Sequence, residues 1–227
     1  LENEMQTETY QPAEGKIEFR NVSFSYDGKE DLLQKVNFTW QPGTINYLEG
    51  KGKTTIAKLI MGMCHPSGGT ILLDGADAKS YSLKSVRQHI AFLSEKTHLH
   101  GNTIFKCLYL RKNEHSDVEV QNCLRMFHLS FATNGDLDLH RNIGNCGKLL
   151  CRSDYKKLLI ARTILSKKKI WIMDELVDEL EEDSKQRLFT YLKQVKSEYT
   201  ILMDGRYKVE LKEKPHLVFD GLKIICE

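Results

Sequence analysis

One short segment restricts the fold of this 227-residue chain more than any other, because it combines glycines, lysines and hydroxyl side chains between two kinds of secondary structure. The apolar run INYL at 45–48 predicts a short buried strand, and TTIAKLIMGM at 54–63 predicts a helix. The residues at the junction are Gly50, Lys51, Gly52, Lys53, Thr54 and Thr55. A strand, a glycine loop and a helix in this order predict an α/β fold.

The chemistry of this segment suits a phosphate group. Glycines let backbone N–H groups approach an anion, a helix N-terminus favours negative charge, a lysine reaches outer phosphates, and a hydroxyl can bind magnesium. The pattern G-x-x-x-x-G-K-[ST] also requires a glycine five positions before Gly52, where Tyr47 stands. Three more residues between Gly50 and Lys51 would complete the pattern. Either the loop has become shorter than this pattern, or three of its residues are missing from this sequence. The alternative to a phosphate site is a Gly- and Lys-rich turn between strand and helix that binds no ligand.

A second segment has matching chemistry. The apolar run in KIWIMDE at 169–175 predicts a buried strand that ends in Asp174 and Glu175. Ligands of parallel sheets bind at the carboxyl ends of strands, so we expect Asp174 to hold magnesium through water and Glu175 to polarise an attacking water. An acidic pair after a strand is by itself more often a helix entry or a solvated loop. Its position after a phosphate-type loop favours the functional interpretation.

The rest of the chain predicts further strands and helices around these two segments. Strands are expected at 16–24, 35–40, 68–75, 90–93 and 200–204, and a helix at 183–195. Residues 102–165 carry helical patterns without a convincing strand, which predicts a helical insertion. The run HLVFDGLKII at 216–225 predicts a hairpin around Asp220 and Gly221. Residues 1–15 are polar, without periodicity, and are expected to be a linker or tail.

Composition excludes little but narrows the class of partner. The formal net charge is 33 − 31 = +2. Such a small charge produces no strong positive electrostatic potential around the protein, so we expect no nucleic-acid partner. No stretch approaches the roughly 20 apolar residues of a membrane-spanning helix, and we expect a soluble chain. Because it begins with Leu1, we also expect a piece of something longer. Six scattered cysteines predict reduced thiols in the cytosol, a disulfide between Cys146 and Cys151 being the alternative.

In their order, these segments resemble the nucleotide-binding domain of an ATP-binding-cassette (ABC) transporter, particularly of the exporter type, over residues 16–227. The resemblance rests on the opening GKIEFRNVSFSYDG, then GGTILLDG, ARTIL at 161–165, WIMDE and HLVFDGLKII. It implies a P-loop NTPase fold of the ABC ATPase type, with an antiparallel β lobe and a helical subdomain. Tyr26 is similar to the family's aromatic residue that stacks on adenine, a tyrosine packed on the sheet being the alternative.

The resemblance also implies a function and partners. Mg-ATP would be bound with Lys53 and the loop amides on the phosphates, Thr54 and Asp174 on Mg²⁺, and Glu175 on the attacking water. The implied partners are a transmembrane domain and a second nucleotide-binding domain in a homo- or heterodimer. The implied location is the cytoplasmic face of a membrane, where ATP binding and hydrolysis are coupled to transport.

Several positions depart from the family pattern. The signature L-S-G-G-Q is replaced by LCRSD at 150–154, which loses both glycines, and an inert helix N-cap formed by Ser153 or Asp154 is the favoured interpretation there. Glu95 stands where the family has a glutamine that contacts the nucleotide site; its carboxylate can accept from water or bind magnesium but cannot donate, and a solvated loop acid is the alternative. No switch histidine follows the strand TILM, where Asp204, Gly205 and Arg206 stand instead. The segment 176–183, LVDELEED, replaces small and hydroxyl residues by bulky and acidic ones.

These departures leave two other interpretations open. The first is a catalytically impaired ABC-type ATP-binding module that acts as a regulatory or structural subunit. The second is a cassette ATPase of the DNA-repair or chromosome-organising kind. The missing coiled-coil insertion, the near-neutral charge and the exporter-like opening oppose the second.

Overall fold

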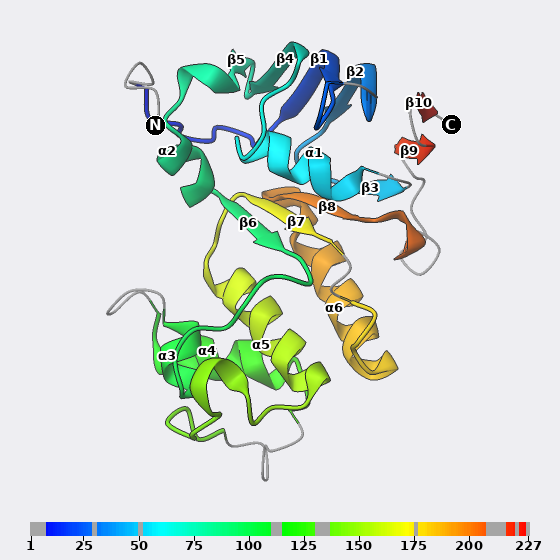
Figure 1. Ribbon diagram of the computed structural model, residues 1–227. Helices are drawn as coiled ribbons and strands as arrows, with labels where there is room; N and C mark the ends of the chain where they lie inside the picture. The colour runs from blue at the N-terminus through cyan, green and yellow to red at the C-terminus, as the bar shows by residue number, and fades with distance from the viewer. Residues whose placement is uncertain are drawn as a thin grey trace. The chain divides into compact units, whose positions relative to one another are not determined.

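The computed structural model describes residues 8–28, 31–49, 52–109, 115–129, 137–174, 177–207, 217–220 and 223–225. The chain forms two compact units (Figure 1). The sheet unit comprises residues 1–92, 168–174 and 193–227, and the helical unit comprises residues 93–167 and 175–192.

The first sheet of the sheet unit is antiparallel. It contains β1 (Ile17–Phe24), β2 (Leu33–Trp40), β4 (Gly68–Leu73) and β5 (Ala76–Asp77), in the order β2-β1-β4-β5. Ile17 of β1 lies opposite both Trp40 and Leu73, and all three side chains are buried. The alternation of apolar and polar residues therefore places one face of this sheet in the core, and the predicted antiparallel lobe is confirmed.

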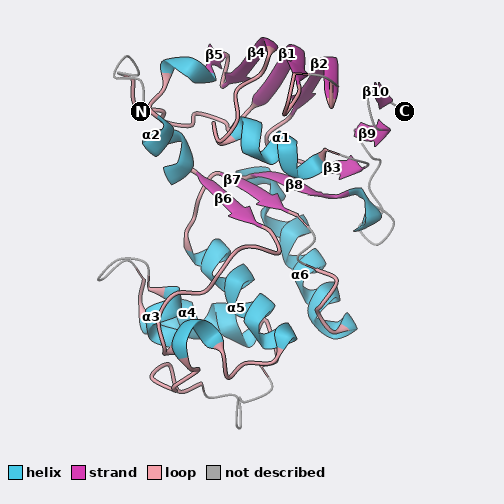
Figure 2. Ribbon diagram, in the orientation of Figure 1, coloured by secondary structure: helices cyan, strands magenta, loops and turns pink. Residues whose placement is uncertain are grey.

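The second sheet contains β3 (Ile45–Glu49), β6 (Ile90–Leu93), β7 (Ile170–Met173), β8 (Thr200–Asp204), β9 (Leu217–Asp220) and β10 (Lys223–Ile225). Their order in the described residues is β10-β9-β3-β8-β7-β6 (Figure 2). β8 pairs in parallel with both β3 and β7, so the carboxyl ends of these three strands share one edge. β9 and β10 pair antiparallel, as the predicted hairpin requires, while their connection at 221–222 lies outside the described residues.

Helix α1 (Lys53–Ile60) packs between the two sheets. Its buried Ile56, Leu59 and Ile60 belong to one hydrophobic core with Phe19 and Trp40 of the antiparallel sheet and with Ile172 and Leu202 of the parallel sheet. Burial of such side chains contributes about 1.5–3 kcal/mol each relative to exposure. This packing holds the first residue of α1 next to the carboxyl edge of the parallel sheet. The short helix α2 (Leu83–Gln88) and three 3₁₀ turns, at 78–80, 196–198 and 205–207, complete the sheet unit.

The described part of the predicted tail is attached to the sheet unit. Tyr10 is fully buried, and its hydroxyl donates to Asp74 Oδ2 at 3.0 Å. Asp74 also accepts hydrogen bonds from the backbone N–H groups of Ala13, Gly15 and Lys16 at 2.8–3.1 Å. Burial and the neighbouring Asp74 raise the pKa of Tyr10, so it remains a neutral donor. Tyr10 and Gly15 thus fix this segment to the sheet unit, although most of residues 8–14 are exposed, and the linker interpretation of 1–15 stays a prediction. Residues 1–7 lie outside the described residues.

The helical unit contains α3 (Ile104–Leu108), α4 (Asp117–Arg125), α5 (Arg152–Leu165) and most of α6 (Glu182–Val195), with a 3₁₀ turn at 145–147. Ser116 and Glu119 form a capping box at the start of α4. Helix α5 packs against α3 and α4 and carries fully buried Leu158 and Ile160. The predicted helical subdomain is therefore present, with no named strand in the described residues of 102–165, while the bounds of the insertion stay a prediction. Within the described residues, no helix combines the length and apolarity needed to cross a membrane.

Candidate functional site

The predicted phosphate loop ends in a glycine with a left-handed backbone. Gly52 is the N-cap of α1 and has φ of 101°, a conformation that a side chain makes costly. Strand β3 ends at Glu49 and α1 begins at Lys53, so residues 50–52 alone connect them. Gly50 and Lys51 lie outside the described residues, and their predicted role stays a prediction.

Lys53 lies at the carboxyl edge of the parallel sheet. Its ammonium donates a hydrogen bond to Asp204 Oδ2, across 151 positions of the sequence. Arg206 Nη2 donates to the same oxygen at 3.0 Å, and the backbone N–H of Arg206 donates to Oδ1 at 3.0 Å. Two cations therefore converge on one carboxylate at the end of β8.

The Asp204 carboxylate is ionised despite its burial. Its side chain has no exposed surface. Burial alone raises the pKa, but hydrogen bonds from Arg206 and Lys53 and the Lys53 charge outweigh that effect and lower the pKa below its ordinary value. This ion cluster was not predicted from the sequence. The sequence did offer one indication of it. Asp204 is the last residue of β8, and Asp174 directly follows β7, so both carboxylates were expected at the carboxyl ends of strands.

Thr54 and Asp174 lie together, as a shared magnesium role requires. Thr54 Oγ1 donates to Asp174 Oδ2 at 2.6 Å, across 120 positions of the sequence. A hydroxyl and a carboxylate oxygen are hard donors of the kind that Mg²⁺ prefers, so the residues present fit this ion. Asp174, Lys53 and Asp204 also line one small cavity at the sheet edge. Glu175 lies outside the described residues.

Tyr26 combines an exposed ring with an anchored hydroxyl. Its side chain is largely exposed, and its ring meets Phe24 edge-on with centroids 4.8 Å apart. The hydroxyl lies 2.9 Å from Oγ1 of buried Thr55, and Lys58 Nζ lies 5.7 Å from the ring centroid. Thr55 therefore orients Tyr26, and its own predicted contact with nucleotide stays a prediction. The ring thus packs against Phe24 and is also largely exposed, and adenine binding there stays a prediction.

Glu95 belongs to the helical unit and is exposed. It lies in a turn closed by the backbone hydrogen bond from Thr97 N to Ser94 O at 3.0 Å. Its predicted contact with nucleotide or magnesium stays a prediction.

The start of α5 differs from the expected N-cap. The N-cap is Cys151, whose sulfur accepts a hydrogen bond from the Asp154 N–H at 3.5 Å, so the assignment of this role to Ser153 or Asp154 was wrong. The Ser153 hydroxyl instead donates to Glu181 Oε2 at 2.5 Å. Arg152 Nη1 lies 3.6 Å from Glu179 Oε1. Arg152 and Ser153 of the signature segment are thus bound by two acidic residues, Glu179 and Glu181.

A buried lysine strengthens this contact. Lys157 Nζ lies 2.8 Å from Glu181 Oε2 and 3.6 Å from Asp154 Oδ1, and it donates to the His128 carbonyl at 2.7 Å. The side chain of Lys157 is only 3% exposed, so it needs these partners. Hydrogen bonds from Lys157 and Ser153 lower the pKa of Glu181 to about 2.

Replacement of Glu181 by Gln is expected to make folding stability less dependent on pH. The folded-state pKa lies below the ordinary value, so the Glu181 contribution is present above pH 5 and disappears as the pH falls toward 2. Because the Glu181 side chain is 58% exposed, we expect a loss on the order of 1 kcal/mol at pH 7. Urea unfolding at several pH values measures this, with exposed Glu198→Gln as the control. A pH-independent difference between wild type and Glu181→Gln would contradict the assignment.

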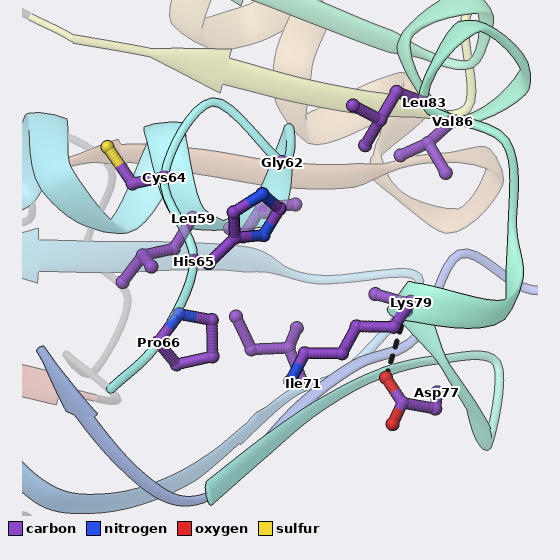
Figure 3. A pocket seen from close by; sticks show the side chains of 12 residues that line it. Leu59, Gly62, Cys64, His65, Pro66, Ile71, Asp77, Lys79, Leu83 and Val86 are labelled. Atoms are coloured by element: carbon purple, nitrogen blue, oxygen red, sulfur yellow. Dashed lines mark hydrogen bonds between the residues drawn. The ribbon is translucent and has the colours of Figure 1, made fainter. Parts of the chain in front are cut away.

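A separate pocket of the sheet unit is mainly apolar. Figure 3 shows Leu59, Ile71, Leu83 and Val86 around it, with His65, Asp77 and Lys79 at its border. The Asp77 carboxylate there accepts the Lys79 backbone N–H at 2.9 Å and caps a 3₁₀ turn. None of the predicted site residues lines this pocket, and its chemistry does not suit a phosphate.

The chain is similar to known proteins in sequence. The family model described as ABC transporter matches residues 33–178. The ATP-dependent lipid A-core flippase of Salmonella paratyphi A is 34% identical over 95% of this chain and 38% of its own length. The flippase of the same name from Haemophilus influenzae is 32% identical over 89% of this chain and 36% of its own length. The chain thus spans less than two fifths of these relatives.

A solved structure resembles the fold. The chain matches a structure of a bacterial Atm1-family ABC exporter with ATP bound, with a TM-score of 0.80 and 21% identity. The match covers 94% of this chain and 38% of that one.

Proposed function

The chain belongs to the ABC transporter family as an exporter-type nucleotide-binding domain, and on this basis we propose that it binds Mg-ATP at Lys53 and couples ATP binding and hydrolysis to transport. The transporting partner would be a transmembrane domain, and the location would be the cytoplasmic face of a membrane. The relatives, which are much longer than this chain, support that proposal.

One observation carries the proposal. Lys53, Thr54 and Asp174 meet at the carboxyl edge of β3, β7 and β8, where parallel sheets bind their ligands. Lys53 and the N-terminus of α1 would neutralise phosphate charge, and Thr54 and Asp174 would hold Mg²⁺. When bound, Mg²⁺ supplies further neutralisation of phosphate charge.

The remaining roles follow from the same edge. Glu175 directly follows Asp174, so its carboxylate is the proposed general base that orients and deprotonates the attacking water. Tyr26 is the proposed adenine contact, with its hydroxyl on Thr55 and its ring largely exposed. The proposed nucleotide site is completed by the remaining predicted residues, which are Gly50, Lys51, Gly52, Thr55 and Glu95.

The signature half of the chain supports pairing with a different subunit. In an ABC dimer each ATP lies between the phosphate loop of one subunit and the signature of the other. Here Ser153 is bound by Glu181 and Arg152 by Glu179, so this signature is poorly prepared for phosphate. A partner with an intact signature would give one competent site, built on Lys53 and Glu175 of this chain, and one silent site.

The isolated chain is therefore expected to show negligible ATPase activity, which rises substantially when its membrane portion or a heterologous partner is supplied. Release of phosphate at saturating Mg-ATP measures this, with each partner assayed alone as the control. Turnover of about 1 s⁻¹ or faster by the isolated chain would remove the case for a partner. The double replacement Arg152→Gly/Ser153→Gly should raise the ATPase activity of the isolated chain only if the chain forms homodimers. Analytical sedimentation in the presence of ATP tests whether it does.

A further inference from the structure

One buried carboxylate binds the lysine that the proposed function assigns to phosphate. Asp204 Oδ2 accepts from Lys53 Nζ and, at 3.0 Å, from Arg206 Nη2. Arg206 also donates its backbone N–H to Oδ1 at 3.0 Å. The Lys53 side chain is 17% exposed and the Asp204 side chain is fully buried. Asp204 therefore holds Lys53 at the cavity that both residues line.

A carboxylate and a phosphate compete for such a lysine. Both are anionic acceptors that form charge-assisted hydrogen bonds with an ammonium. Removal from water strengthens the attraction between Lys53 and Asp204, and it equally strengthens the repulsion between Asp204 and a second anion brought to the same ammonium. A phosphate that binds Lys53 must therefore overcome the contact with Asp204.

Arg206 makes this exchange feasible. A buried carboxylate that loses its only cation is strongly destabilising, because the charge remains buried and unpaired. Arg206 contacts both oxygens of Asp204, through its side chain and its backbone. Asp204 thus stays paired when Lys53 turns to another anion.

We propose that Asp204 is an internal competitor of nucleotide phosphates for Lys53, and that Arg206 is the counter-ion that releases Lys53 to them. The inference rests on the proposed function, in which Lys53 binds ATP. Asp204 then sets the affinity of the site for its ligand. Arg206 is a positioning residue that acts through Asp204 and does not itself contact phosphate.

Calorimetric titration of the full chain with Mg-ATP tests this with four variants. Asp204→Asn keeps the shape and the acceptor for the Arg206 N–H but removes the competing charge, so binding should tighten about tenfold. Arg206→Ala leaves Lys53 as the cation on Asp204, so binding should weaken by several-fold, and Arg206→Lys should restore it. The double variant Asp204→Asn/Arg206→Ala should bind Mg-ATP with the same affinity as Asp204→Asn alone. Arg206 acts only through the Asp204 charge, so its removal has no effect once that charge is gone. Exposed Asp138→Asn, in the helical unit, controls for the loss of one negative charge.

Any other result of these titrations contradicts one specific part of the proposal. Equal or weaker binding by Asp204→Asn, with Lys53-dependent binding by wild type, overturns the competitor role but leaves the proposed function intact. Weaker binding by the double variant than by Asp204→Asn overturns the indirect role of Arg206. If circular dichroism shows that Asp204→Asn does not fold, unchanged binding by Arg206→Ala overturns the inference. Absence of binding by both wild type and Asp204→Asn overturns the proposed function and the inference with it.

Discussion

Replacement of Glu175 by Gln is expected to lower ATP turnover about 10²-fold or more while ATP binding is retained. Gln keeps the shape of the side chain but cannot accept a proton, so water is no longer activated. The residue directly follows Asp174, whose carboxylate accepts from Thr54 at the edge of the parallel sheet. Because a partner is expected to complete the site, turnover is measured with that partner present, and affinity by calorimetry.

The matched control is Glu182→Gln, the same chemical change at the exposed start of α6. It should leave turnover unchanged. If wild type and Glu175→Gln hydrolyse ATP at the same rate in the assembled protein, the general base is a different residue.

Replacement of Lys53 by Ala is expected to weaken binding of Mg-ATP by about tenfold or more. A charge-assisted contact to phosphate contributes on the order of 1.5–3 kcal/mol, which corresponds to that loss. The fold should persist, since Arg206 still pairs with the buried Asp204 carboxylate. Calorimetric titration measures the affinity, and thermal unfolding checks that the variant is folded.

Exposed Lys193→Ala on α6 removes one positive charge away from the predicted loop and serves as the control. Its affinity should equal that of wild type. Equal affinities of wild type and Lys53→Ala would show that ATP, if bound, does not use this lysine.

Local patterns in the sequence predicted most of the secondary structure. The two-residue alternation of β1 and the apolar runs of β3, β7 and β8 reflect which side chains one strand presents to the core, and this is a property of neighbouring residues. The same holds for helices α1 and α6, whose predicted starts at 54 and 183 lie within one residue of the observed ones. The short helix α2 was not predicted, because six residues carry too little periodicity.

Part of the candidate site was also predictable from the sequence. Glycine, lysine and threonine after a strand, and an aspartate after another, specify phosphate and magnesium chemistry by residue type alone. Their meeting follows from parallel pairing, which brings the carboxyl ends of β3, β7 and β8 to one edge. The sequence assigned Thr54 and Asp174 to the same ion, and in the structure the two side chains share a hydrogen bond.

The pairing of charges was decided only by the tertiary structure. Nothing near Asp204 in the sequence names Lys53 as its partner, since 151 positions separate them and only the β3-β8 pairing brings them together. In the same way, Ser153 and buried Lys157 both bind Glu181, a residue more than 20 positions away. Tyr10 donates to Asp74, which also accepts from the backbone of the segment before β1. Periodicity and residue type are properties of local sequence and determine elements and chemistry. Which buried charge neutralises which depends on distances between segments, and those exist only once the chain has packed.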